Sequence, residues 1–157
     1  MTRPIITVSE AIILQSLHLL QHTGLERKEM VLLWLAFQAK KDIIIKEVFC
    51  PRQTAASDYF RIPRDSMEEL LAHLRNKSLM VAVQIHTHQF EAFHSNADDR
   101  WAIMRHVGAL SFVLPNFALQ TSLDTFISDV AIFELSKKNR WIKIPQHKHN
   151  KYLRICL

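Results

Sequence analysis

Residues 79–88 read Leu-Met-Val-Ala-Val-Gln-Ile-His-Thr-His, an apolar run of strand length that ends in two histidines. A run with so few polar interruptions is typical of a strand that is covered on both faces of a sheet. Residues 30–37 (MVLLWLAF) form a second run of this kind. Residues 42–49 (DIIIKEVF) are rich in β-branched side chains and stop shortly before Pro51. These segments predict three buried or half-buried strands of a central sheet.

Helical patterns flank these strands. Ser9 has the character of an N-cap, and Ile13, Leu17 and Leu20 follow it at helical spacing until Gly24, which we expect to close this helix. A second helix is predicted to open at Asp65 or Ser66, and a third over residues 96–107, ended by Gly108. Further strands are predicted at 109–115, 128–135, 141–144 and 152–156.

The pattern as a whole predicts an α/β fold: one domain over residues 1–157 with a central mixed sheet flanked by helices. The length suits one domain, and 48% apolar with 22% charged residues is ordinary for a folded protein. No apolar run reaches the roughly 20 residues that cross a bilayer, and the N-terminal stretch does not resemble a signal peptide. Two cysteines fit a reducing compartment, so we expect a cytoplasmic protein without membrane contact.

A net charge of +5 raises the possibility of nucleic-acid binding. The excess of lysine and arginine gathers near the C-terminus, between Lys137 and Arg154, but no nucleic-acid-binding motif accompanies it. We therefore interpret it as solvated surface rather than as a polyanion site.

His86 and His88 are the residues most suggestive of chemistry. Because they lie two apart at the end of a strand, their side chains leave the same face, about 7 Å apart along the backbone. Two such imidazoles can converge on one ion at a ligand distance of about 2.1 Å. Asp98 follows ten residues after His88 and could complete a set of two histidines and one carboxylate. Such a set leaves a position for water, as catalytic zinc sites do.

Other interpretations of these residues stay open. His-x-His pairs are common without metal, and Ser95 with Asp98 also matches a capping box at the start of a helix. His94 is either a further ligand, a side chain that supports the ligands from behind, or one that faces the substrate. Glu29 precedes a strand, where a glutamate is usually a solvated flank, and Glu26 competes with it as a candidate base.

In combination, His86-Thr-His88, Ser95-x-x-Asp98 and the glutamate Glu29 resemble the JAMM motif. This motif belongs to the JAB/MPN metalloproteases, which remove ubiquitin or ubiquitin-like proteins from their conjugates. Residues 29–36 (EMVLLWLA) resemble the family's Glu-x-x-Gly-x-Leu-x-Gly strand, and residues 79–88 and 91–118 resemble its bacterial branch, found with ubiquitin-like conjugation systems. The resemblance extends over about residues 5–144 and implies a fold arranged like that of cytidine deaminases.

The sequence departs from the family pattern at three places. Six residues rather than seven separate His88 from Ser95, so that a shift by one would make Asp99 the third ligand. We prefer Asp98 because it preserves Ser-x-x-Asp. Gln89 stands where the family usually has proline, and Leu32 and Ala36 replace two strand glycines. None of these changes removes a group that the reaction needs.

The resemblance implies a zinc-dependent peptidase or isopeptidase. Zn²⁺ would be held by His86, His88 and Asp98, Glu29 would act as the general base toward a metal-bound water, and Ser95 would hydrogen-bond the oxyanion. A ubiquitin-like protein, its conjugate or other members of such a conjugation system would be the partners. A catalytically silent MPN-type scaffold and a basic nucleic-acid-associated module are the alternatives.

Overall fold

One curved sheet organises the chain in the computed structural model, which describes residues 3–94, 98 and 102–157. Its eight strands lie in the order β10-β1-β3-β2-β6-β7-β8-β9, and strands β4 and β5 form a separate two-stranded hairpin. The strands are β1 (Ile5–Ser9), β2 (Val31–Ala36), β3 (Asp42–Phe49), β4 (Thr54–Ala55), β5 (Phe60–Arg61), β6 (Met80–Thr87), β7 (Leu110–Leu114), β8 (Ala131–Leu135), β9 (Trp141–Lys143) and β10 (Leu153–Cys156).

The sheet is mixed, as the sequence predicts. Strand β1 pairs in parallel with both β10 and β3, and β6 pairs in parallel with β7. The pairs β2–β3, β2–β6, β7–β8 and β8–β9 are antiparallel. Strands β2 and β6 therefore occupy the middle of the sheet, with three strands on either side of the pair, so that the end of β6 is buried among neighbours.

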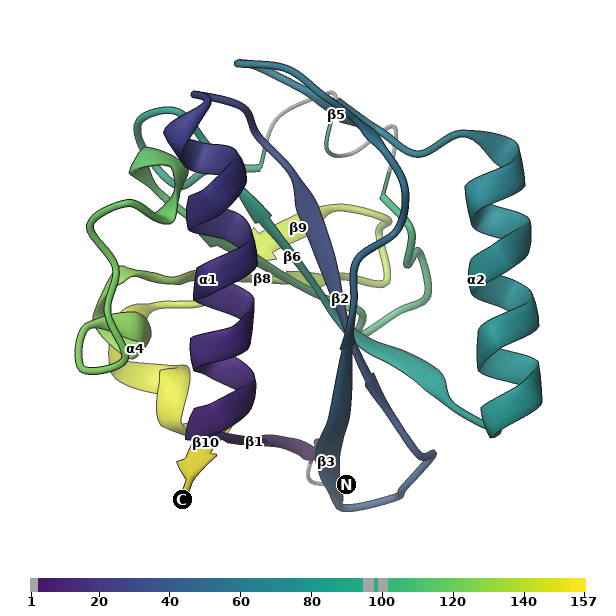
Figure 1. Ribbon diagram of the computed structural model, residues 1–157. Helices are drawn as coiled ribbons and strands as arrows, with labels where there is room; N and C mark the ends of the chain where they lie inside the picture. The colour runs from purple at the N-terminus through teal and green to yellow at the C-terminus, as the bar shows by residue number, and fades with distance from the viewer. Residues whose placement is uncertain (1–2, 95–97, 99–101) are drawn as a thin grey trace.

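Two helices cover the middle of the sheet from opposite sides (Figure 1). Helix α1 (Glu10–Leu25) packs Ile13, Leu17 and Leu20 against alternate side chains of β2 such as Leu32 and Trp34. Helix α2 (Arg64–Lys77) packs against the other face of β2, where Val31, Leu33 and Leu35 lie. All six residues of β2 are consequently buried, which explains why its sequence is apolar without alternation.

The helix termini agree with the sequence in part. The Ser9 side chain accepts a hydrogen bond from the Ile12 amide, which confirms the predicted N-cap of α1. Gly24 lies in the last turn, and the helix ends one residue later at Leu25. Helix α2 begins at Arg64 after Pro63, one residue before the earlier of the two predicted starts. Proline suits this position because its fixed φ and missing donor cost nothing outside the first turn.

Other differences concern the second half of the chain. Residues 102–107 are not helical, so the predicted helix over 96–107 is wrong there, and 95–97 and 99–101 lie outside the described residues. The chain instead runs irregularly to a turn at Gly108, whose φ is +86°. A short helix α4 (Phe126–Asp129) takes the start of the predicted strand 128–135, which begins only at Ala131. In the first half of the chain, strand β1 and the β4–β5 hairpin were not predicted, and each strand of that hairpin has only two residues.

Two 3-10 turns complete the described elements: η1 (Asn116–Ala118) follows β7, and η2 (Gln146–Lys151) precedes β10. In the described part of the chain, no helix has the length and apolar character needed to cross a membrane.

Candidate metal centre

The end of β6 places two histidines side by side. His86 pairs with Val31 of β2 on one side and Val113 of β7 on the other, so its backbone is fixed by two neighbouring strands. The His88 amide continues the β7 pairing by donating to the Leu114 carbonyl at 2.9 Å. Between the two histidines, the Thr87 hydroxyl instead accepts from the Met30 amide. This alternation puts both imidazoles on the same face, with ring centroids 5.2 Å apart, as the sequence predicts.

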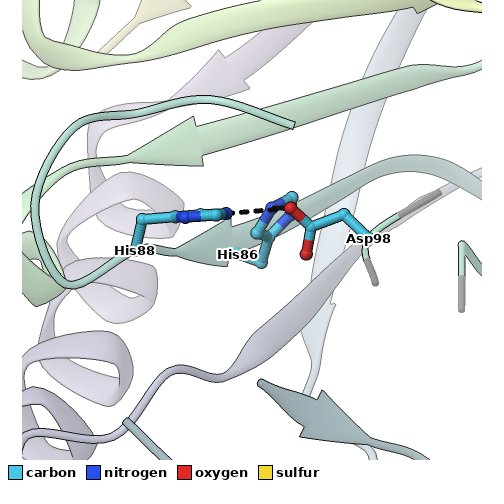
Figure 2. A group of neighbouring side chains, drawn as sticks. All are labelled: His86, His88 and Asp98. Carbon is cyan, nitrogen blue, oxygen red and sulfur yellow. Dashed lines mark hydrogen bonds and ion pairs between the residues drawn. The ribbon is translucent and has the colours of Figure 1, made fainter. Parts of the chain in front are cut away.

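The carboxylate of Asp98 points toward both imidazoles (Figure 2). Its Oδ2 lies 2.8 Å from His88 Nε2 and 3.1 Å from His86 Nε2. One donor atom from each of the three residues lies within 4.8 Å of the other two. Tetrahedral ligands at about 2.1 Å from an ion would stand about 3.4 Å apart, so this convergence fits a small divalent ion. Among the described residues, these three form the one such group of histidine, cysteine and carboxylate side chains.

The chemistry of the donor set agrees with a metal site. His86, His88 and Asp98 are all at least 95% buried. Within the described part of the chain, neither ring nitrogen of His86 has a hydrogen-bond partner, although Nε2 lies close to Asp98. A buried imidazole without hydrogen bonds costs roughly 1–3 kcal/mol, which a metal ligand bond would offset. His86, His88 and Asp98 can therefore hold a metal ion.

Glu29 lies beside this group rather than in it. Only 3% of the residue is exposed, and its Oε1 is 3.8 Å from His88 Nδ1. Burial raises the pKa of Glu29 from 4.5 to about 7, and the charge of Asp98 adds to the rise. His88 and the Gln89 amide, which hydrogen-bonds the carboxylate, act in the opposite direction. The competing candidate, Glu26, is exposed and pairs with Lys28, so it is not part of the site.

The β4–β5 hairpin covers the site next to Glu29. The Glu29 amide donates to the Ala56 carbonyl, and Gln53 bonds both backbone groups of Val31. From β5, the Phe60 ring lies 5.5 Å from the His86 ring. The hairpin therefore closes one side of the site and contributes to the burial of Glu29. Sequence reasoning missed Phe60, because a two-residue strand in a polar loop carries no periodic signal.

The loop after His88 rests on a left-handed turn. Asn116, Phe117 and Ala118 all have φ between +54° and +61°, a region that costs a non-glycine residue about 1–2 kcal/mol. In this conformation the Phe117 amide donates to the His88 carbonyl at 2.8 Å, and the Asn116 amide donates to the Phe90 carbonyl at 3.0 Å. These bonds hold the backbone that follows His88, at the end of the strand that carries the candidate ligands.

The chain segment that follows Asp98 is hydrogen-bonded to the sheet through Gln84. This buried side chain accepts from the Ile103 amide at 3.0 Å and donates to the Ser111 hydroxyl at 3.1 Å. In the sequence, a polar residue between Val83 and Ile85 of an apolar run could have indicated that Gln84 has such a role. Ser95 and the alternative ligand Asp99 lie outside the described residues, so their predicted roles stay predictions.

The fold and the site together define a mixed α/β protein with a buried two-histidine, one-aspartate centre at the end of its central strand. The chain is 31% identical over 130 residues to the "Probable metalloprotease y4jG" of Sinorhizobium fredii, an alignment that covers 80% of this chain and 78% of that protein. The chain therefore belongs to this metalloprotease family. No model of a known protein family matches the sequence.

A comparison of folds agrees with the architecture. The solution structure of protein DSY2949 from Desulfitobacterium hafniense superimposes with a TM-score of 0.64 at 15% sequence identity. The match covers 97% of this chain and 93% of that one, so nearly the whole fold is shared. At this identity the likeness concerns the fold alone.

Proposed function

We propose that the chain is a zinc-dependent peptidase or isopeptidase of the JAB/MPN type, which cleaves the bond after the C-terminus of a ubiquitin-like protein. The observation that carries the proposal is the convergence of His86, His88 and Asp98 beside a buried glutamate. Membership of a metalloprotease family supports proteolysis as the reaction. The JAMM-like order of Glu29, His86-x-His88 and Ser95-x-x-Asp98 supports the particular family and its substrate class.

His86, His88 and Asp98 would hold the ion through two neutral imidazoles and one carboxylate, a donor set that suits zinc. Zinc held there would polarise the scissile carbonyl and make water acidic enough to supply hydroxide near pH 7. Three protein ligands leave a position for water or substrate, which a closed structural site would not.

Glu29 would move the proton. Its carboxylate is held beside His88 but does not belong to the ligand group, so it stays available to accept a proton from water and to deliver it to the leaving amine. The β4–β5 hairpin supports this placement, because the Glu29 amide donates to the Ala56 carbonyl and the residue is buried.

Replacing the base while keeping the metal tests this role. We expect Glu29→Gln to retain zinc and to lose about 10²–10⁴-fold in kcat, because the amide keeps the size but cannot accept the proton. Glu26→Gln is the matched control, since Glu26 is exposed and pairs with Lys28, and it should cleave at the wild-type rate. A wild-type rate for Glu29→Gln would place the base elsewhere.

Two residues outside the described ranges complete the proposal. Ser95 would donate a hydrogen bond to the developing oxyanion, an interaction worth about 3 kcal/mol in comparable sites. Ser95→Ala should therefore lower kcat while zinc affinity persists.

Asp98→Ala should release zinc, whereas Asp99→Ala should retain it. The reverse result would establish the alternative alignment, in which Asp99 is the third ligand.

The substrate class is tested with fusions that carry an extension after a ubiquitin-like C-terminus. We expect the tail to bind in extended form through main-chain hydrogen bonds, so a proline within it should weaken cleavage without affecting zinc binding.

Chelation by 1,10-phenanthroline should abolish cleavage, and added zinc should restore it. Cleavage that survives complete metal removal would overturn the mechanism. Failure on every ubiquitin-like fusion, with zinc bound, would move the substrate to another peptide or amide.

A further inference from the structure

The loop that carries the chain from His88 toward Asp98 has no regular secondary structure over residues 88–94. Its first part is fixed by backbone hydrogen bonds from the left-handed turn to the carbonyls of His88 and Phe90. Beyond Phe90 the contacts are of another kind. Ala92 packs against the cluster of Val113, Ala131 and Phe133, and the Phe93 ring lies 4.3 Å from the His88 ring.

His94 is the last described residue of this loop before Asp98, and its ring lies among aromatic side chains. It stacks on Trp141 with ring centroids 4.7 Å apart and an angle of 27° between the planes. The ring of Phe133 lies 5.5 Å away, and that of His86 lies edge-on at 5.6 Å. Stacked and edge-on aromatic pairs at these separations contribute beyond the area that they bury.

The surface on which His94 stacks belongs to the sheet. Trp141 opens β9 and pairs with Leu135 of β8, while Phe133 lies on β8 itself. Both rings are therefore carried by the antiparallel ladder at one edge of the sheet, far from Asp98 in sequence. His94 connects this ladder to the chain segment that delivers the third candidate ligand.

We propose that His94 is a positioning residue: its ring, stacked on Trp141, holds the loop so that Asp98 meets His86 and His88. This inference rests on the proposed metal site. The four residue steps from His94 to Asp98 span at most about 14 Å, whereas the eight steps from Phe90 span about twice that. Releasing the stack would enlarge the volume that the Asp98 carboxylate samples, and the affinity for metal would fall accordingly.

The stack distinguishes this role from ligation. A ligand acts through a ring nitrogen, and the donor group formed among the described residues comprises His86, His88 and Asp98, without His94. A positioning ring acts through its faces, so any planar aromatic side chain of similar size would serve. Phenylalanine keeps the ring and removes both nitrogens, which makes His94→Phe the decisive substitution.

The experiment measures zinc affinity by competition with a chromophoric chelator for the full chain and its variants. We expect His94→Ala and Trp141→Ala each to weaken zinc binding about tenfold, the lower end of what partners of metal ligands contribute. His94→Phe should stay within about threefold of the wild type. The double variant His94→Ala/Trp141→Ala should be no weaker than either single one, because both remove the same stack.

His18→Ala is the matched control, since His18 is exposed on α1, and it should bind zinc like the wild type. Thermal unfolding of the metal-free variants verifies that each is folded. A loss with His94→Phe as large as with His94→Ala would overturn the inference and make a ring nitrogen the important group. Unchanged affinity in Trp141→Ala would overturn it as well. Absence of zinc binding by the wild-type chain would refute the proposed function together with this inference.

Discussion

The two faces of strand β6 differ in what they bury. Toward α1, Val83 and Ile85 are completely buried among apolar side chains that include Trp34 of β2. Toward the other face, Gln84 and His86 are almost as deeply buried but are polar: Gln84 accepts from the Ile103 amide, and His86 lies next to Asp98. Between residues 83 and 86 the strand thus alternates between Val83 and Ile85 on the core face and Gln84 and His86 on the polar face.

This division implies that stability and metal binding can be changed separately. The α1 face stabilises the fold through apolar burial, which does not depend on the ion. The site face contains buried polar groups whose unfavourable burial is offset in part by one another and would be offset further by a metal ion. Four predictions test the division, from the largest expected effect to the smallest.

The largest effect is expected on the site face. His88→Ala should weaken zinc binding by roughly 100-fold or more, because it removes a ligand and not merely a partner of one. Metal content after dialysis and chelator competition measure the loss. Thermal unfolding of the metal-free variant verifies that it is folded. Full zinc occupancy in this variant would contradict the site.

The core face should give the opposite result. Ile85→Ala should lower the free energy of unfolding by about 2–5 kcal/mol, through lost burial and the cavity that remains. Urea denaturation of the metal-free protein measures this change. Zinc affinity should stay within about threefold of the wild type at low temperature. A zinc loss comparable to that of His88→Ala would show that the two faces are not independent.

Glu29 should make the metal-free protein less stable as the pH rises. Its pKa is raised from 4.5 to about 7 in the folded state, so the folded state binds more protons than the unfolded state between these values. The stabilisation is present below pH 4.5 and is lost as the pH rises to about 7, by roughly 3 kcal/mol in total.

Denaturation at several pH values, with chelator present, compares the wild type with Glu29→Gln. The variant lacks this group, so the difference in unfolding free energy between the two proteins should change by that amount across pH 4.5–7. A constant difference would mean that the carboxylate is not buried as described.

The smallest effect concerns the contact between α1 and the left-handed turn. A Cβ at Gly24 would lie 2.5 Å from the Phe117 carbonyl oxygen and 2.9 Å from its Cβ. Gly24→Ala should therefore destabilise the protein by about 1 kcal/mol, because the clash exceeds the gain in helix propensity. His18→Ala, an exposed substitution in the same helix, is the control and should not destabilise. A stabilised Gly24→Ala variant would show that the turn yields easily.

Much of the architecture can be predicted from local patterns. Strands β2, β3, β6 and β7 follow from apolar or β-branched runs, and α1 follows from its cap and its apolar spacing. The order of the strands cannot be predicted in this way. Nothing local indicates that β3 lies between β1 and β2, because that arrangement depends on which faces α1 and α2 must cover together.

The irregular segment 102–107 shows why local patterns fail. Ile103 and Met104 lie four and three residues before Val107, a spacing that favours a helix. However, the Ile103 amide donates to Gln84, and Met104 is buried near Ala109 and Leu135. Contacts with side chains distant in sequence provide the hydrogen bond and the burial that a helix would otherwise supply.

The sequence by itself determined that His86 and His88 share a face, since a strand alternates its side chains with period two. It also supplied Asp98 and Glu29 as candidates, but could not place them. Only the tertiary structure brought the Asp98 carboxylate within 3.1 Å of both imidazoles and buried Glu29 at 3.8 Å from His88. These approaches depend on the conformations of the β4–β5 hairpin, the left-handed turn at residues 116–118 and the loop of residues 88–94. Long-range contacts set these conformations, so a local sequence pattern cannot predict them.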